Sequence, residues 1–422
     1  MHPNMRRAHD IAWRKFYKDE TQLFYDCELK GPADYSSVEE VTTEIPGVNC
    51  RGRGLGDPCL DTGWRLDGLL LAHRLTGDKE WAEKATKLFH GLVRLAQVPQ
   101  EKGFIPRGVY PGRTDFYPHS SRDQHTSFIY AMWNYCRSPL ATAQDKTVAT
   151  DLVLAVCRRL ERNNHDIAAS NGKCPAVFGA LSGYCLGESD RLLMFYKAAY
   201  VMSGERHWQD LYLAKRYENN SRRLQTLGGA PGRLSWRQNI HGRFQTQMAL
   251  QLLLTCEDDP DVRRVCRDVL AENAESVMTH IDLWHIFARP TYETEELPLE
   301  EVWRDYKEWH ERHLYRCPPT AYLAVHTWYH YMRDQRRYEA VERARSVGRM
   351  YCPPMLPAFR HLVEATATVM MSEDEARMRD AGAKAWPFLV AADYDIALTN
   401  GTTCFLELAY WRGVERGIFP LA

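Results

Sequence analysis

The sequence WRLDGLLLAHRLTGDKEWAEKATKLFHGLVRLA (residues 64–96) contains the pattern that decides the fold. Apolar residues recur at helical spacing over Trp64–Leu75 and again over Trp81–Ala96. The short polar segment Thr76-Gly-Asp78 between them favours a turn. The stretch therefore predicts two helices joined by a tight turn, which together form an αα-hairpin.

The same order of apolar helix, small polar turn, tryptophan and amphipathic helix returns later in the chain. Leu192–Met202 and Trp208–Leu224 flank the segment Ser203-Gly-Glu205 in this way. Less regular helix pairs are predicted over residues 124–162, 245–280, 320–349 and 358–388. A period of about 35 to 45 residues is typical of helical repeat arrays. The chain is therefore predicted to be all-α, with six helical hairpins.

The two helices of each hairpin differ in character. The first is the more apolar, as in Leu69–Leu71 and Leu250–Leu254, whereas the second carries charges such as Arg158 and Glu161. A helix that is apolar on most sides is buried, while an amphipathic helix faces solvent on one side. We therefore expect an (α/α)6 barrel of inner and outer helices, formed by one catalytic domain over residues 1–422.

Additional helices are expected at the chain ends, over Met5–Leu29 and Thr402–Val414, where they would pack together and close the ring or complete an (α/α)7 barrel. The alternative architecture is an open α-solenoid that binds peptides along its concave face. Against it, the segments between hairpins are long and rich in Gly, Pro, Tyr, His and Arg, as in Val98–Ser121 and Ala168–Asp190. Loops of this length usually serve binding or catalysis.

Composition narrows the functional classes. The 422 residues carry 54 Lys and Arg against 55 Asp and Glu, so no whole-molecule field favours nucleic acid or an anionic membrane as a partner. The 12 cysteines are scattered singly, which predicts reduced thiols and no metal site, and we expect no cofactor. No apolar stretch resembles a signal peptide or a membrane span. We expect a cytoplasmic monomer or homodimer, unless a leader has been removed.

Chemistry is expected to gather at one rim of the barrel. If the first helix of each hairpin is inner, every inner-helix N-terminus and every long connecting segment lies at the same end, where helix dipoles favour anionic groups. These starts are unusually polar and aromatic, in residues 51–65, 107–125, 182–191 and 236–245, with 393–395 and Asn400 near the C-terminus.

Carboxyl, imidazole and phenol groups at this rim are the catalytic candidates. They are Asp61, Asp123, His119, His125, Tyr184 and His241. Asp61 and Asp123 also suit helix N-caps, and a histidine near a helix end is often simply hydrogen-bonded. Because so many such groups fall at one rim, their clustering favours a functional site over capping alone.

Aromatic rings and guanidinium groups at the rim are the binding candidates, because aromatic faces stack on sugar rings and arginine pairs with carboxylates. The predicted substrate-binding set is Trp64, Arg65, Arg113, Tyr117, Arg122, Gln124, Trp236, Arg237 and Arg243, with Tyr110, Tyr315, Arg51, Arg53 and Arg107 in the same segments. The arginines favour an acidic ligand such as a uronic acid. Phosphate is a rival anion, but no glycine-rich phosphate loop of a known type is present.

The hairpin pattern, with Leu60-Asp-Thr-Gly-Trp64 and Ser121-Arg-Asp-Gln-His125 at inner-helix starts, resembles the six-hairpin glycosidase superfamily of (α/α)6 barrels. That superfamily includes unsaturated glucuronyl hydrolases, β-glucuronidases and several uronate-cleaving lyases. The resemblance covers most of the chain as architecture and implies an active site among the inner-helix starts. In the glucuronyl hydrolases one aspartate acts as general acid and base, and Asp61 and Asp123 are the best-placed matches.

Two reactions on an acidic oligosaccharide fit these residues. A glycoside hydrolase needs one protonated carboxyl and one carboxylate. We expect Asp61, beside Trp64, to be the acid and Asp123 to be the base, since contact with Arg122 would lower the pKa of Asp123.

A uronate lyase would instead use a histidine or tyrosine as the base for β-elimination. Its candidates are Tyr117, His119, His125, Tyr184, His241 and Arg243. A sugar 2-epimerase, which uses paired histidines, and a non-catalytic glycan-binding toroid are the further alternatives. The sequence analysis favours the hydrolase.

Overall fold

The computed structural model describes residues 1–421 except 27, 30, 32–34, 39–53, 171, 173–175, 177–178, 185–186, 228–239, 288–356, 393 and 395–399. Within these residues the chain is mostly α-helical with almost no strand, which confirms the predicted all-α class. The chain divides into two compact units, a division that the sequence analysis did not predict. Unit 1 comprises residues 1–12, 233–247 and 268–422, and unit 2 comprises residues 13–232 and 248–267.

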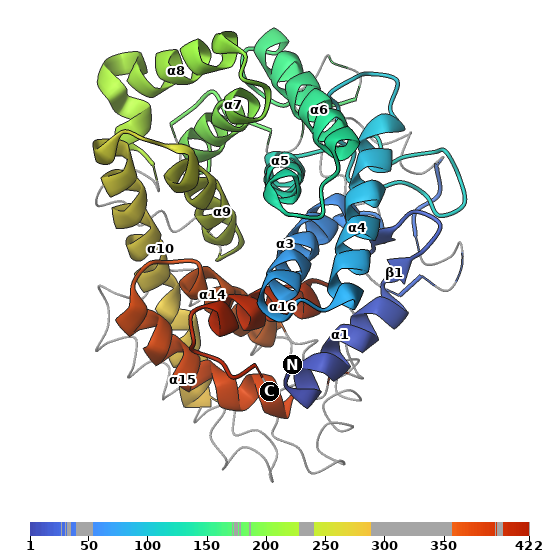
Figure 1. The fold of residues 1–422 in the computed structure, drawn as a ribbon, viewed down its shortest axis with the longest axis vertical. Coiled ribbons are helices and arrows are strands. Elements are labelled where there is room, and N and C mark those ends of the chain that lie inside the picture. The colour runs from blue at the N-terminus through green and yellow to red at the C-terminus, as the bar shows by residue number, and fades with distance from the viewer. Residues whose placement is uncertain are drawn as a thin grey trace. The chain divides into compact units, whose positions relative to one another are not determined.

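Unit 2 contains three successive helical hairpins (Figure 1). They are α3 (Pro58–Thr76) with α4 (Lys79–Gln97), α5 (Arg122–Arg137) with α6 (Ala143–Arg162), and α7 (Ser189–Ser203) with α8 (Arg206–Gln225). The apolar helices α3, α5 and α7 pack side by side, and α4, α6 and α8 each pack on the first helix of their own hairpin. In this unit the first helix of a hairpin is buried along more of its length than the second, as predicted from their composition.

Helix α3 begins earlier than the predicted Trp64. Its first residue is Pro58, whose fixed φ suits the first helical turn and whose missing N–H leaves no donor unpaired there. The helix ends where Gly77 adopts a left-handed φ of 69°, a conformation that glycine takes without a steric penalty.

The N-cap alternative for the two predicted aspartates is wrong. Asp57 is the N-cap of α3, so Asp61 lies one turn inside the helix. Ser121 is the N-cap of α5, and Asp123 lies in its first turn. Both carboxylates are therefore displayed from helical positions at the start of an apolar helix.

Helix α8 is interrupted near its C-terminal end. Glu218 has an extended ψ of 145°, and Asn219, Asn220 and Ser221 follow with left-handed φ values of 49°, 56° and 62°. We call Asn219–Ser221 the left-handed segment. This conformation costs roughly 1–2 kcal/mol per residue for ordinary L-amino acids and less for asparagine. The surrounding contacts must therefore stabilise it.

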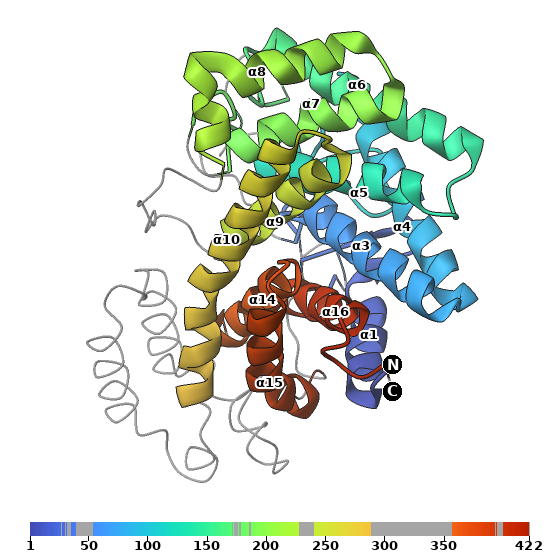
Figure 2. The ribbon, with the colours of Figure 1, turned by 60° about the vertical axis from the view of Figure 1, so that its left-hand side comes forward.

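Unit 1 contains α14 (Pro357–Met370), which packs against α15 (Glu375–Ala391) and α16 (Asn400–Glu415) (Figure 2). The boundary between the units falls within three further helices, α1 (Pro3–Lys15), α9 (Ile240–Cys256) and α10 (Pro260–Phe287). The predicted pair over residues 320–349 lies outside the described residues.

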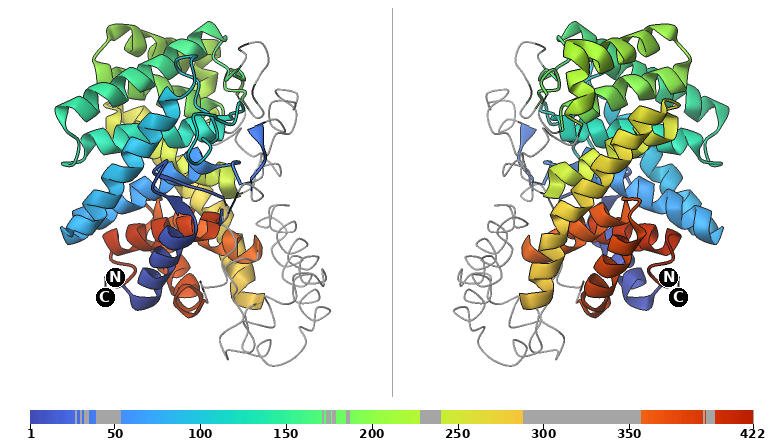
Figure 3. Two further views of the ribbon diagram at one scale, coloured as in Figure 1. Left: turned by 90° about the vertical axis from the view of Figure 1, so that its right-hand side faces the viewer. Right: turned by 90° about the vertical axis from the view of Figure 1, so that its left-hand side faces the viewer.

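The two ends of the chain meet in unit 1, as expected for the terminal helices. His9 Nδ1 on α1 lies 2.9 Å from Glu407 Oε1 on α16. The main-chain N–H of His2 donates to the Tyr410 hydroxyl at 3.1 Å. Figure 3 shows the chain ends next to each other in both views.

The predicted helix over Met5–Leu29 is too long. Helix α1 ends at Lys15 and is followed by a short antiparallel hairpin of β1 (Tyr17–Lys18) and β2 (Leu23–Phe24). Leu23 and Phe24 are fully buried, so their apolar character reflects packing in unit 2 rather than a continued helix face.

Cys59, Cys136, Cys157, Cys256, Cys266 and Cys404 are free thiols. In the described part of the chain, no helix combines the length and apolar character required to cross a membrane.

Candidate functional site

The starts of α3 and α5 are joined directly by hydrogen bonds. The N–H of Leu60 donates to Gln124 Oε1 at 3.0 Å, and Ser127 Oγ donates to the Leu60 carbonyl at 2.8 Å. Asp61 follows Leu60 and Asp123 precedes Gln124, so the two predicted catalytic aspartates flank one contact, which we call the α3–α5 junction. Asp61 is buried, whereas the side chain of Asp123 is 26% exposed.

Hydrogen bonds from Gln124 and Arg107 hold the α3–α5 junction together. Gln124 Nε2 donates to Asp57 Oδ1 at 2.8 Å, and an Arg107 guanidinium N–H donates to the same oxygen at 2.9 Å. Arg107 also donates to the Gly56 carbonyl at 2.8 Å. Gln124 is fully buried. Its predicted role in substrate binding is therefore replaced, in this structure, by a role in positioning the helix starts.

A carboxyl group that the sequence analysis missed lies at the same place. The two oxygens of Asp26 accept 2.8 Å hydrogen bonds from the main-chain N–H groups of Gly56 and Asp57. Burial raises the pKa of Asp26 well above its usual value, with further raising by the carboxylates of Asp57 and Asp61. No helical spacing links Asp26 to the α3 start, since it is placed there by the loop after β2.

The starts of α5 and α7 are joined by two ion pairs. Arg191 on α7 lies 2.5 Å from Asp123 Oδ1, and Arg122 on α5 lies 3.6 Å from Glu188 Oε1. The close partner of Asp123 is therefore the buried Arg191 from the neighbouring helix rather than the adjacent Arg122. A guanidinium partner favours the charged form of a carboxyl group. Burial, followed by repulsion from Arg191, lowers the pKa of Arg122.

Asp190, in the first turn of α7, falls within the predicted rim segment 182–191 but was not among the catalytic candidates. It is fully buried, and neither side-chain oxygen has a hydrogen-bond partner among the described residues. The buried Nε atoms of Arg122 and Arg191 likewise have none there. Buried polar groups normally have hydrogen-bond partners. Unpaired donors and acceptors gathered at one helix start therefore suggest that this helix start has a functional role.

The two predicted histidines of this unit are both buried, His125 in the first turn of α5 and His119 in the segment before that helix. His125 Nδ1 lies 2.9 Å from the Ser121 carbonyl, which only accepts, so Nδ1 carries the proton and Nε2 the lone pair. Burial lowers the pKa of His125 to about 3. His119 is also buried, with its ring 5.2 Å from that of Tyr117.

The predicted sugar-stacking rings of this unit belong to the core. Trp64, Tyr110 and Tyr117 are fully buried and present no ring face to solvent in this structure. Arg65 is also fully buried, with its guanidinium 4.2 Å from the centre of the Phe24 ring. Their helical or loop positions were predicted, but their burial depends on packing that the sequence pattern does not specify.

Arg113 lies in the loop closed by the bridge between Val109 and Phe116, where it is largely exposed and pairs with Asp115 at 2.8 Å. Several predicted residues lie outside the described part of the chain: Trp236, Arg237, Tyr315, Arg51, Arg53 and residues 393 and 395.

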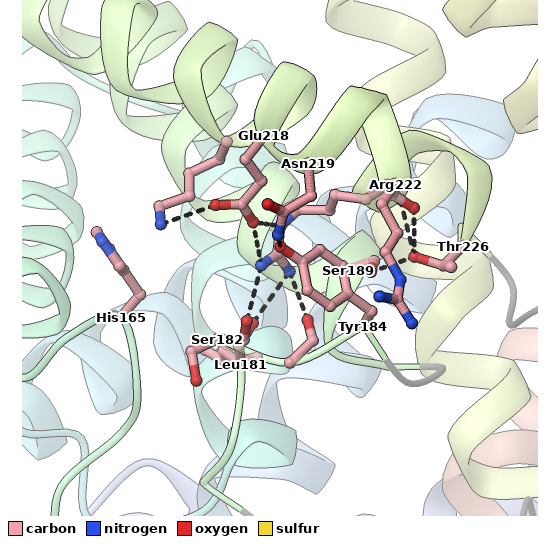
Figure 4. Close-up of polar contacts among 12 residues, drawn as sticks. His165, Leu181, Ser182, Tyr184, Ser189, Glu218, Asn219, Arg222 and Thr226 are labelled. Carbon is pink, nitrogen blue, oxygen red and sulfur yellow. Dashed lines mark hydrogen bonds and ion pairs between the residues drawn. The ribbon is translucent and has the colours of Figure 1, made fainter.

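Tyr184, predicted as catalytic, lies against the end of α8 (Figure 4). Its hydroxyl accepts a hydrogen bond from Asn219 Nδ2 in the left-handed segment. The guanidinium groups of Arg222 and Arg223 lie over its ring, 5.0 and 4.9 Å from the centroid. These contacts fix both the hydroxyl and the ring of Tyr184. Such an arrangement is better suited to positioning a ligand than to transferring a proton.

His241 and Arg243 belong to unit 1, not to the unit that holds the predicted aspartates. His241 Nδ1 lies 3.0 Å from the buried Glu364 Oε1. Arg243 donates to Asn273 Oδ1 at 3.0 Å, and burial lowers its pKa to about 10. The sequence analysis missed Glu364, although a lone carboxylate within an apolar helix is a signal that would have found it.

Within the described residues, no three His, Cys, Asp or Glu side chains gather in an arrangement that would hold a metal ion. Comparison with known proteins finds no family model that matches the chain and no curated protein or solved structure with significant similarity to it.

Proposed function

We propose that this protein is a glycoside hydrolase of the glucuronidase type, which cleaves a uronic-acid-containing oligosaccharide at the α3–α5 junction. The observation that carries the proposal is the set of carboxyl groups there. Asp26, Asp57 and Asp61 interact at the start of α3, while Asp123 stands on the neighbouring helix with Arg191 as its partner. Hydrolysis of a glycosidic bond needs one carboxyl that donates a proton and a second that is ionised.

The electrostatics support a division of roles between the two helix starts. Burial and the nearby carboxylates of Asp57 and Asp61 raise the pKa of Asp26, so Asp26 is the carboxyl group of this cluster that favours its protonated form. Asp123, beside a guanidinium, is suited to the charged form. In the proposed reaction Asp61, next to this protonated carboxyl group, donates the proton to the leaving oxygen, and Asp123 activates water or stabilises the developing positive charge.

We also propose that the whole chain forms an (α/α)6 barrel with these helix starts at one rim. Three successive hairpins with apolar first helices in unit 2 support this arrangement. The contacts between α1 and α16 in unit 1 are those that ring closure requires.

The test is activity on uronic-acid-containing oligosaccharides, followed by reducing ends and by absorbance of the unsaturated uronate. Asp61→Asn and Asp123→Asn should each lower kcat by about 10²–10⁴-fold, the usual contribution of a general acid or base. Asp115→Asn is the control, since Asp115 is a partly exposed carboxylate paired with Arg113. Wild-type rates in both Asn variants would contradict the assignment.

A uronate lyase is the second candidate, and His241 with Glu364 favours it. A carboxylate that contacts Nδ1 orients an imidazole and raises its basicity, as in other catalytic dyads. This reaction would create new absorbance as the chain is cleaved and would depend on His241 and Glu364 rather than on Asp61. A sugar 2-epimerase would also use histidines, and His9 with Glu407 supplies a second pair in unit 1, but it would release no reducing ends. Silence in every assay would favour a glycan-binding toroid.

A further inference from the structure

The arginines first expected to bind an acidic substrate already have internal partners where the structure describes them. Arg107 pairs with Asp57, Arg113 with Asp115, Arg122 with Glu188, and Arg243 donates to Asn273. Recognition of a carboxylate needs guanidinium N–H groups that are not already used in this way. The carboxylate-binding arginine is therefore to be sought elsewhere.

Arg222 meets this requirement. Its side chain is exposed, and its guanidinium makes no hydrogen bond or ion pair among the described residues. Its carbonyl accepts a hydrogen bond from the main-chain N–H of Thr226. The single carboxylate of this cluster, Glu218, is taken by Arg223 at 2.7 Å and by Lys215 at 3.1 Å. The contact that places the Arg222 guanidinium is the ring of Tyr184 (Figure 4).

The support under Tyr184 is held firmly. Arg223 donates to three consecutive carbonyls of the preceding loop, those of Leu181, Ser182 and Gly183, at 3.1, 2.9 and 2.8 Å. Arg223 itself is fully buried, so these bonds are shielded from water. The ring over which Arg222 lies is thus fixed before any ligand arrives, which reduces the entropy lost on binding.

The backbone that presents Arg222 is strained. Arg222 directly follows the left-handed segment, whose Asn219 donates to the Tyr184 hydroxyl and whose Ser221 has a left-handed φ of 62°. Without this interruption the helix would continue through Arg222 at its regular angle. Conformations of this kind persist where the surrounding structure enforces them, and they concentrate at ligand-binding positions.

This cluster is linked to the start of α7, and through it to Asp123. Ser189 Oγ, in the first turn of α7, lies 2.8 Å from Thr226 Oγ1, just after α8 (Figure 4). Two residues further along the same turn, Arg191 pairs with Asp123. A ligand bound at Arg222 therefore occupies the same end of unit 2 as the proposed base.

We propose that Arg222, held over the ring of Tyr184, binds the carboxylate of the uronic-acid substrate and so selects acidic over neutral sugars. The substrate class rests on the function proposed above. The paired N–H groups of the guanidinium meet the two carboxylate oxygens, and the exposed part of the Tyr184 ring lines the same position. Arg222 is thus a specificity-determining residue, distinct from the groups that transfer protons.

The kinetic test compares Arg222→Gln with Arg222→Lys, and uses Arg206→Gln as the matched control. Arg206 is an exposed arginine at the other end of α8, with a long contact to Asp210 of 3.7 Å. Arg222→Gln should raise KM for a uronic-acid substrate by about 10- to 100-fold, the effect of losing hydrogen bonds to a charged group, and leave kcat nearly unchanged. Arg222→Lys should raise KM by less than Arg222→Gln does, because lysine keeps the positive charge but lacks the planar pair of donors. The control, and KM for the matching neutral sugar, should not change.

A binding measurement separates this inference from the proposed reaction. Titration calorimetry with sodium glucuronate requires no turnover, and should show binding by the wild type, by Asp61→Asn and by Arg206→Gln, but not by Arg222→Gln. Binding of this pattern without cleavage of any oligosaccharide would support the carboxylate site and refute the hydrolase. Equal binding and equal KM in Arg222→Gln and the wild type would overturn the inference, even if Asp61→Asn were inactive.

Discussion

The start of α3 and the end of α8 lie in the same unit and are both rich in charged side chains, but they use them differently. At α3, Gln124 and Arg107 converge on Asp57, and these contacts hold two helices together. At α8, Arg223 secures a loop while Arg222 stays exposed beside a strained backbone. The comparison shows that the number of arginines near a site overstates how many can bind an anionic ligand, because most of them already pair with groups of the protein itself.

The largest effect is expected from pH at the α3–α5 junction. The pKa of His125 falls from 6.5 to about 3 on folding, so the unfolded chain binds a proton in this interval that the folded chain does not. Stability should therefore be intact above pH 6.5 and fall by about 1.4 kcal/mol per pH unit below it, toward pH 3. Unfolding free energies measured from pH 7.5 to 4.5 should show this slope in the wild type and a flatter one in His125→Gln.

His90→Gln is the control for this measurement, because His90 is half exposed and its contact with Asp145 is 3.5 Å. An unchanged slope in His125→Gln, or an equal flattening in His90→Gln, would show that the buried imidazole is not the origin of the pH dependence.

A smaller but still large loss is expected when the internal partners at α3 are removed. Arg107→Ala leaves the Gly56 carbonyl and Asp57 without hydrogen bonds from a buried guanidinium, and should lower the free energy of unfolding by about 2–3 kcal/mol. Denaturant titration measures this change. Arg222→Ala should cost less than about 0.5 kcal/mol, and equal losses in the two variants would remove the contrast between the regions.

A gain in stability is expected where the backbone of α8 is strained. Ser221→Gly should stabilise the protein by about 1 kcal/mol, because glycine adopts a left-handed φ without a steric penalty. Ala214→Gly, at an exposed helical position of the same helix, should instead destabilise it by about 1 kcal/mol. Thermal unfolding of both variants measures the two signs, and destabilisation by both would mean that Ser221 is not strained.

The smallest effect is expected at the exposed ion pair of Arg113 and Asp115. Because solvent screens this pair, Arg113→Ala should change the unfolding free energy by less than about 0.5 kcal/mol. A loss comparable to that of Arg107→Ala, measured in the same denaturant series, would show that this exposed loop contributes more to stability than solvent screening allows.

Much of the local structure could be predicted from the sequence. The helix predicted over Trp81–Ala96 extends by only a few residues in α4, and the helix predicted over Trp208–Leu224 matches α8 apart from its interruption at the left-handed segment. Helical periodicity and turn residues are local signals, and helices form from local hydrogen bonds. Where the apolar character came from packing instead, as in Leu23 and Phe24, the same signal extended a helix that the structure ends at Lys15.

The candidate site was predicted in its location along the chain but not in its partners. Asp61 and Asp123 were singled out by their place at helix starts, and their helices do meet at one junction. Asp26 and Arg191 were missed as their neighbours, since each comes from a segment with no fixed spacing to the residue it contacts. Side-chain pairing across helices is a non-local property.

The sequence by itself determined the helical hairpins, the balance of charge and the concentration of polar residues at helix starts, because each depends on neighbours along the chain. Only the tertiary structure decided which of those residues are buried, which carboxyl group interacts with which, and which arginine is left for a ligand. Trp64 and Arg222 illustrate the difference, one being buried although its ring suited a sugar, the other exposed although no motif contains it. The physical reason is that burial and ion pairing are set by contacts between segments far apart in the sequence, and those contacts form only when the helices pack.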